Sequence, residues 1–262
     1  MHPMITIALR AARDAAEAIA LSSDRLDRVQ IIDSTPTGFL TTMDQNSDKT
    51  ILYHLEKSYP AHSFHSRISG LKQGTDKEVI WLIDPLVGSR NFASGYTQFA
   101  VSIACQIGGI VKHAVIINPL ANEEYIATRG DGAQLNSRRI RVSSNIEFEN
   151  ALISINPENI SVPAAVKMQA FLLEQGSHVR ISGCTALDIL HVAANRVQGG
   201  WAANTNSLSI AGANLILQEA GGLIGSESGN PDPSKGQELV FANPRFFKTL
   251  LKSRHDAEVG KN

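Results

Sequence analysis

Residues Trp81–Phe92 read WLIDPLVGSRNF and carry the strongest structural signal of the sequence. This stretch continues the unbroken apolar run Val79–Ile83, which predicts a strand that is buried on both faces. The run ends in Asp84-Pro85, so the Asp84 carboxylate is expected at the end of that strand. The stretch therefore predicts a buried strand with the carboxylate of Asp84 at its C-terminal end.

The segments around this strand predict a first half of helices on an antiparallel-rich sheet. Pro3 suits the first position of a long helix whose apolar residues recur at helical spacing up to Ile19. A second helix is expected over 45–57, after a loop at 33–38. Strands are expected at 99–106, 110–117 and 125–127, with a hairpin turn at 107–109.

The second half changes to an alternation of strands and helices. The pattern predicts strands at 152–155, 179–182 and near Trp201, and helices at 162–174, 186–196 and 208–219. Such alternation is typical of a layered α/β lobe. We therefore expect an N-terminal α+β lobe over residues 1–146 and a C-terminal α/β lobe over residues 147–262.

Composition excludes several classes of protein. The 262 residues are 43% hydrophobic and 19% charged, which does not fit disorder or a coiled coil. The formal net charge of -1 gives no field that would hold a polyanion. Cys105 and Cys184 lie in apolar stretches, which predicts buried, reduced thiols and a cytoplasmic protein. We find no signal peptide or membrane span in the sequence.

The stretch resembles the signature of the inositol monophosphatase family, D-P-x-D-G-[ST]-x-N-F after an apolar strand. The resemblance covers essentially the whole chain and is strongest to a bacterial branch of the family. Further family motifs occur in the same order along the sequence: Tyr59-Pro60, Gly70, 99–104, Asn118-Pro119, 127–130, Gly132-Ala133, 219–222 and Asn243-Pro244-Arg245.

The resemblance implies the αβαβα sandwich of the sugar-phosphatase superfamily, and a homodimer. Active members are Mg²⁺-dependent phosphomonoesterases, in which carboxylates hold two or three metal ions that activate water and bind phosphate. By resemblance, Asp84 and the Leu86 carbonyl are metal ligands, and Ser89 belongs to the catalytic turn. Some bacterial relatives are associated with transcription complexes, so a protein partner of that class is a further expectation.

Most of the family's acidic ligands are replaced in this chain. The Glu-Glu pair falls on Arg67 and Ile68, and the second Asp of the signature falls on Val87. The Asp of the later Trp-Asp motif falls on Ser209. By resemblance, three other family positions are replaced: Ser34 and Gly38 stand for a Lys and an Asp, and Ala202 stands for a Glu near the substrate. A fourth, Asp44, is retained.

Charge then decides between enzyme and pseudoenzyme. Asp84 with Arg67 makes the pocket locally neutral, whereas two divalent ions about 4 Å apart repel by roughly 16 kcal/mol at a dielectric near 20. We therefore predict a catalytically inactive protein that needs no cofactor and has a binding or regulatory role. The alternative is a weakly active Mg²⁺-dependent inositol-1-monophosphatase that relies on Asp84, the Leu86 carbonyl and Ser89.

Two readings of Arg67 remain open, a solvated surface residue or a guanidinium that occupies the vacated metal position and pairs with Asp84. By resemblance, Gly88, Ser89 and Arg90 would still hold the phosphate of a small molecule, because backbone donors at a helix start bind phosphate without metal. Gly183-Cys184-Thr185 matches the turn that borders the family's substrate, although Cys184 is equally explained as core packing.

Overall fold

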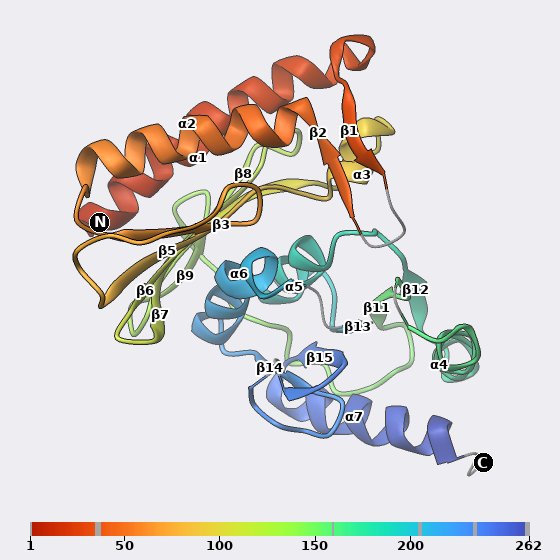
Figure 1. The fold of residues 1–262 in the computed structure, drawn as a ribbon. Coiled ribbons are helices and arrows are strands. Elements are labelled where there is room, and N and C mark those ends of the chain that lie inside the picture. Colours follow the sequence, from red (N-terminus) through yellow and green to blue (C-terminus); the bar gives the residue numbers. More distant parts are fainter. Residues whose placement is uncertain (1, 35–37, 159, 204–205, 233–234, 260–262) are drawn as a thin grey trace. The chain divides into compact units, whose positions relative to one another are not determined.

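The computed structural model describes residues 2–34, 38–158, 160–203, 206–232 and 235–259. It divides into two compact units (Figure 1), which are Met1–Arg138 with Leu208–Ile216, and Arg139–Ser207 with Leu217–Asn262. The change of unit at 138–139 lies a few residues before the boundary expected at 146, and residues 208–216 return to the first unit. Each unit is described by itself below.

The first unit is built on an eight-stranded sheet with the order β10-β9-β8-β7-β6-β5-β3-β4. From β9 to β4 along this order, neighbouring strands are antiparallel except β3 and β5, which are parallel. The strands are β3 (Ser63–Ser66), β4 (Gly70–Lys72), β5 (Val79–Val87), β6 (Ala100–Ile107), β7 (Ile110–Asn118), β8 (Glu123–Thr128), β9 (Gly132–Leu135) and β10 (Arg138–Arg139).

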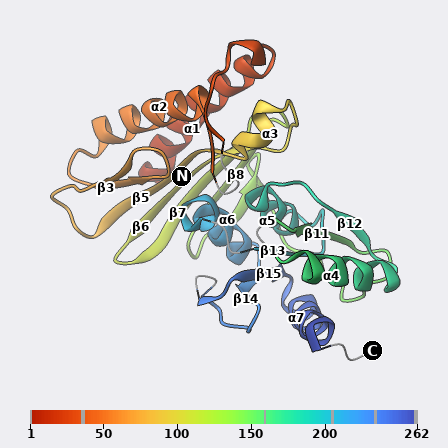
Figure 2. The ribbon, with the colours of Figure 1, turned by 45° about the vertical axis from the view of Figure 1, so that its right-hand side comes forward.

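Two long helices, α1 (Pro3–Ser23) and α2 (Thr42–Ser58), lie side by side on one face of this sheet (Figure 2). Both predicted helices are therefore confirmed, and Pro3 begins α1 as expected. Where a loop was expected at 33–38, β1 (Ile31–Ser34) and β2 (Phe39–Thr41) pair as a small antiparallel sheet. Residues 35–37 of that segment lie outside the described residues.

Strand β5 is buried on both faces, as its apolar run predicts. Ile83 belongs to the core that α1 and α2 cover. Asp84 pairs with Ser102 of β6, and these residues point to the opposite face because side chains alternate along a strand. Helix α6 (Ser207–Glu219) lies on that opposite face, since a Cβ at Gly212 would meet Ser102 Oγ at 3.3 Å.

The expectation that Asp84 ends its strand is wrong. β5 continues to Val87, which pairs with Ala100, and the register shifts between Asp84 and Val87. Pro85 stands in this irregularity, where its missing N–H breaks no regular ladder bond. This irregularity changes the direction of the backbone, and the Asp84 carboxylate and the Leu86 carbonyl both contact the Arg67 side chain.

Strand β5 is followed by the five-residue helix α3 (Ser89–Ala93), and Gly88 forms the turn between them with φ +87°. We expect Gly88→Ala to lower the free energy of unfolding by about 2 kcal/mol or more. Its Cβ would be strained at this φ and would lie 2.8 Å from the Gln98 carbonyl oxygen. Urea denaturation followed by circular dichroism measures the loss.

Gly109→Ala is the matched control for this substitution. Gly109 also has a positive φ, +78°, but a Cβ there would meet nothing within 4 Å. We expect a loss of about 1 kcal/mol from the backbone strain alone. Equal losses in the two variants would show that the close approach of Gln98 has no effect.

The second unit is a five-stranded sheet with the order β12-β11-β13-β15-β14. β11 runs parallel to β12 and β13, and β15 runs antiparallel to β13 and β14. A core that includes Trp201, Phe246 and Leu172 lies between this sheet and helices α4 and α7. The elements are β11 (Leu152–Asn156), α4 (Val162–Glu174), β12 (His178–Arg180), α5 (Thr185–Ala193), β13 (Gly199–Ala203), β14 (Leu223–Ser226), β15 (Glu238–Ala242) and α7 (Pro244–Val259).

The alternation predicted for the second half is confirmed, and the predicted range of α4 is matched residue for residue. Cys105 and Cys184 are both free and buried, as expected. Within the described residues, no helix is both long enough and apolar enough to span a membrane.

Candidate functional site

Asp44 is fixed by the first turn of α2. Thr41 caps this helix, and its hydroxyl accepts from the N–H of Met43 and of Asp44. In return, Asp44 Oδ2 accepts from Thr41 N at 2.8 Å and from Thr41 Oγ1 at 2.7 Å. This reciprocal capping box holds a fully buried carboxylate with its second oxygen, Oδ1, directed into the site.

Asp84 is equally buried and equally well satisfied. Its Oδ1 accepts from Leu86 N at 3.3 Å, and its Oδ2 accepts from the hydroxyl of Ser209 on α6. Ser209 therefore does not only replace an acidic ligand of the family. Its hydroxyl also donates a hydrogen bond to Asp84, the acid that this chain retains. Sequence reasoning recognised the loss of an Asp at this position but missed the new hydrogen bond.

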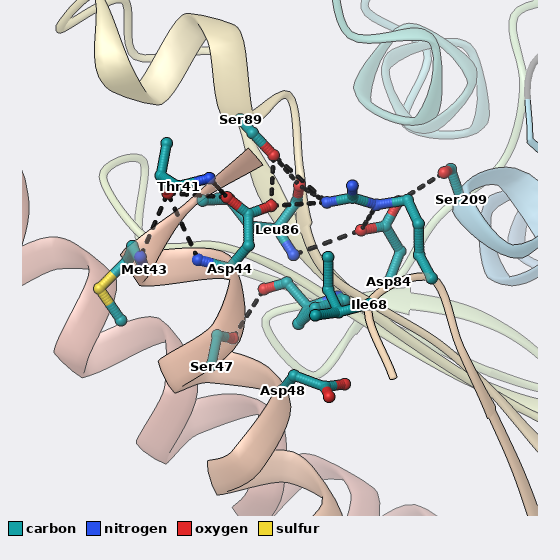
Figure 3. A network of polar contacts seen from close by, with 12 residues as sticks. Thr41, Met43, Asp44, Ser47, Asp48, Ile68, Asp84, Leu86, Ser89 and Ser209 are labelled. Carbon is teal, nitrogen blue, oxygen red and sulfur yellow. Dashed lines mark hydrogen bonds and ion pairs between the residues drawn. The ribbon is translucent and has the colours of Figure 1, made fainter. Parts of the chain in front are cut away.

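Arg67 forms ion pairs with both of these carboxylates. Figure 3 shows Asp44 and Asp84 together with Leu86, Ser89 and Ser209. The Nε of Arg67 donates to Asp84 Oδ1 at 2.8 Å, and its Nη2 donates to Asp44 Oδ1 at 2.6 Å. The same Nη2 lies 3.0 Å from the Leu86 carbonyl oxygen and 3.2 Å from Ser89 Oγ. Of the two readings of Arg67, the structure bears out the ion pair with Asp84, and only 20% of the side chain is exposed.

The chain before Arg67 is positioned by α2. Ser66 Oγ donates to Asp48 Oδ1 at 2.5 Å and accepts from Ile68 N at 3.0 Å. The Arg67 backbone N–H donates to the Ile83 carbonyl at 2.9 Å, which extends the β3–β5 pairing by one residue. These bonds fix the backbone on both sides of Arg67 and so direct its side chain toward Asp84.

Ser89 completes the cluster at the start of α3. Its hydroxyl lies 2.5 Å from Asp44 Oδ1 and 2.9 Å from the Leu86 carbonyl oxygen. The side chain is buried. The six residues that form the cluster are Asp44, Arg67, Asp84, Leu86, Ser89 and Ser209, and we call them the Arg67 cluster.

The charge of the Arg67 cluster differs from the neutral pocket that the sequence predicts. Asp44 joins Asp84 as a second acid, so the two carboxylates and one guanidinium sum to -1. Burial alone would lower the pKa of Arg67, but the Asp84 and Asp44 carboxylates outweigh burial and raise that pKa above its usual range. Arg67 therefore remains a cation.

The residues present do not fit the magnesium ions that the family signature implies. The oxygens of Asp44 and Asp84 already accept hydrogen bonds, and three cluster oxygens surround Nη2 of Arg67 within 3.2 Å. A divalent ion about 4 Å from the guanidinium would be repelled by roughly 8 kcal/mol at a dielectric near 20. In the described part of the chain, no three His, Cys, Asp or Glu residues are grouped to hold a metal.

The other replaced positions add no acidic oxygen. Val87 is buried as an apolar residue next to the cluster, and Ile68 is half-buried. Ala202 is buried in β13 of the second unit. Arg90, predicted to hold a phosphate together with Gly88 and Ser89, is exposed and lies with its guanidinium 4.9 Å from the centre of the Phe39 ring.

The predicted substrate turn Gly183-Cys184-Thr185 belongs to the second unit and begins α5. Gly183 has φ +71°, and Thr185 Oγ1 accepts from Asn156 Nδ2 at 2.9 Å. Asp188, on the same helix, was not predicted. Its Oδ1 accepts from Ser182 Oγ at 2.8 Å, whereas its Oδ2 is buried with no hydrogen-bond partner in the described structure.

Fold and signature together define a protein with a phosphatase fold, and comparison with known proteins identifies its family. The model of the inositol monophosphatase family matches residues 1–258, so the chain belongs to this family. The Nus factor SuhB of Pseudomonas aeruginosa is 36% identical over 258 residues, which are 96% of this chain and 95% of that protein.

Solved structures agree with this assignment. The extragenic suppressor protein SuhB from Bartonella henselae has a TM-score of 0.93 at 28% identity, and the match covers 97% of this chain and 98% of that one. The IMPase of Thermotoga maritima has a TM-score of 0.89 at 25% identity, and 99% of each chain is covered. The αβ architecture expected from the sequence is thereby confirmed.

Proposed function

We propose that this chain is a catalytically inactive member of its family and that it acts by binding other molecules. The observation that carries the proposal is the guanidinium of Arg67, which holds Asp84, Asp44 and the Leu86 carbonyl in place of metal ions. A phosphatase of this type needs paired divalent ions to activate water. In this chain the same oxygens accept hydrogen bonds from the guanidinium of Arg67.

We propose a protein of a transcription complex as the partner. The support is the similarity to proteins named Nus factor SuhB, at 34–36% identity over nearly the whole chain. The test is affinity purification of the tagged chain at native abundance after nuclease treatment. RNA polymerase subunits should be enriched over an untagged control, and their absence from a well-recovered sample would contradict the proposed partner.

Magnesium separates this proposal from the alternative of a weakly active inositol-1-monophosphatase. Mg²⁺ at a hundredfold excess over its Kd would stabilise an enzyme by about 2.7 kcal/mol. We expect no shift of the melting temperature with Mg²⁺ and no release of phosphate from inositol 1-phosphate. Turnover that depends on Mg²⁺ and is abolished by Asp84→Asn would show that the alternative is right.

Carboxylates placed back at the replaced ligand positions should restore the binding of Mg²⁺. We expect the triple variant Arg67→Glu, Val87→Asp and Ser209→Asp to be stabilised by Mg²⁺ by about 2.7 kcal/mol at a hundredfold excess over Kd. The reason is that it exchanges one cation for three carboxylates around Asp84. A matched control, Arg67→Gln, Val87→Asn and Ser209→Asn, has similar side-chain volumes without the charges and should not respond.

A phosphorylated small molecule is the second ligand class that we propose. Arg67 uses Nε and Nη2 in the cluster, while Nη1 takes part in none of the four hydrogen bonds described above. Together with Arg90 it could receive a phosphate. Calorimetric titration with inositol 1-phosphate and with inorganic phosphate tests this. We expect heat that Arg90→Ala reduces severalfold, and an absence of heat with both compounds would exclude the site.

We also propose a homodimer in the cytoplasm. The support is an apolar face on α4, where Val162, Val166 and Leu173 are 74%, 59% and 54% exposed. Light scattering after size exclusion should give twice the chain mass for the wild type and a single chain mass for Val166→Glu. A wild type with a single chain mass at all concentrations would refute the dimer.

A further inference from the structure

The acceptors around the Arg67 guanidinium come from three different elements. Asp44 is on α2, Asp84 and Leu86 are on β5, and Ser89 is on α3. Arg67 itself follows β3. One side chain therefore links four segments of the first unit, and the charge it brings is the only compensation for the two acids within the Arg67 cluster.

These acceptors are also held by bonds that do not involve Arg67. Ser209 and the Leu86 N–H hold Asp84, and both donors of Thr41 hold Asp44. The Leu86 carbonyl is held by the Ser89 hydroxyl at 2.9 Å. The oxygens should therefore stay in place when the Arg67 side chain is removed, and they would enclose a space with a negative charge.

We infer that the Arg67 side chain fills a preformed cation site, and that Arg67→Ala opens this site to a free guanidinium ion. The inference rests on the proposed function, in which no metal ion occupies these oxygens. A guanidinium ion suits the site because its nitrogens lie in one plane and can donate hydrogen bonds to two carboxylates at once. Nε and Nη2 of Arg67 do this in the intact protein.

The experiment is a thermal melt of Arg67→Ala in guanidinium chloride and in sodium chloride of equal concentration. We expect the melting temperature to fall by roughly 10 °C relative to the wild type, because two buried carboxylates lose their partner. Guanidinium up to about 50 mM, far below denaturing concentrations, should raise it again in a saturable way, whereas sodium should not.

Two matched proteins control for general effects of the salt. The wild type already has its site filled, and Arg13→Ala loses an exposed ion pair with Glu124 rather than a buried one. Neither should be stabilised by guanidinium. The inference is overturned if Arg67→Ala melts like the wild type, or if guanidinium acts on it as it acts on the controls.

A second measurement covers the case in which Arg67→Ala does not fold by itself. The denatured variant is then diluted into buffer with guanidinium or with sodium, and near-UV circular dichroism records the native signal. Recovery only with guanidinium supports the site, and equal recovery or none contradicts it. Failure of this rescue contradicts only the preformed cation site, whereas turnover of inositol 1-phosphate by the wild type would refute the proposed function itself.

Discussion

Replacing Arg67 with methionine should lower the free energy of unfolding by about 3–5 kcal/mol. Methionine has a similar length but no charge, so Asp44 and Asp84 would remain buried without a counter-ion. The two carboxylates are 0% and 1% exposed, and water cannot solvate them in the folded chain. Urea denaturation near neutral pH, followed by circular dichroism, measures the effect.

Arg13→Met is the matched control for this prediction. Arg13 donates to Glu124 at 2.6 Å, but its side chain is 56% exposed, so we expect a loss of less than about 1 kcal/mol. Adding Asp84→Asn to Arg67→Met should recover part of the stability, because one uncompensated charge disappears. If Arg67→Met is as stable as the Arg13 variant, the buried ion pairs do not stabilise the fold.

Asp188 should make the stability of the protein depend on pH. Burial raises the pKa of this carboxyl from 3.8 to about 7, even though the hydrogen bond from Ser182 acts to lower it. The folded chain then keeps the proton that the unfolded chain has released, so the free energy of unfolding falls as pH rises from about 4 to about 7. Above that range the contribution is constant.

Asp188→Asn removes this dependence because asparagine has no proton to lose in that range. The stability of the variant relative to the wild type should rise by up to about 4 kcal/mol between pH 4 and pH 8, as three pKa units imply. Ser182→Ala should shift the transition to higher pH, since it removes a bond that favours the charged form. If the free energies of unfolding of variant and wild type differ by the same amount at every pH, Asp188 does not cause the pH dependence.

The sequence predicts which residues lie at the centre of the site, but it leaves two readings of Arg67 open. The motif around Asp84 and the family alignment of Arg67 are local patterns, and the charge of each residue follows from its type. Their ion pair is therefore one of the two readings that the sequence allows. The long helices and the doubly buried strand were also predictable, because their apolar periodicity extends over many residues.

The partners of these two residues were harder to predict. The hydrogen bond between Ser209 and Asp84 joins residues that are 125 positions apart in the sequence, and no local sequence pattern predicts it. For Asp44 a signal existed, since Thr41-Thr42-Met43-Asp44 has the spacing of a capping box. The continuation of β5 beyond Asp84 depends on pairing with Ala100, and such tertiary pairing overrides the local effect of Pro85.

We propose that an arginine, rather than metal ions, neutralises the acids of this site. A crystal structure of the wild type grown with millimolar Mn²⁺ and phosphate would show which cation is present, because anomalous scattering locates manganese. We predict no anomalous peak within about 4 Å of the Asp84 carboxylate, and the Arg67 guanidinium bonded to Asp84 and Asp44. Two manganese peaks at that position, with Arg67 displaced from both carboxylates, would show that metal ions and not arginine neutralise the two acids.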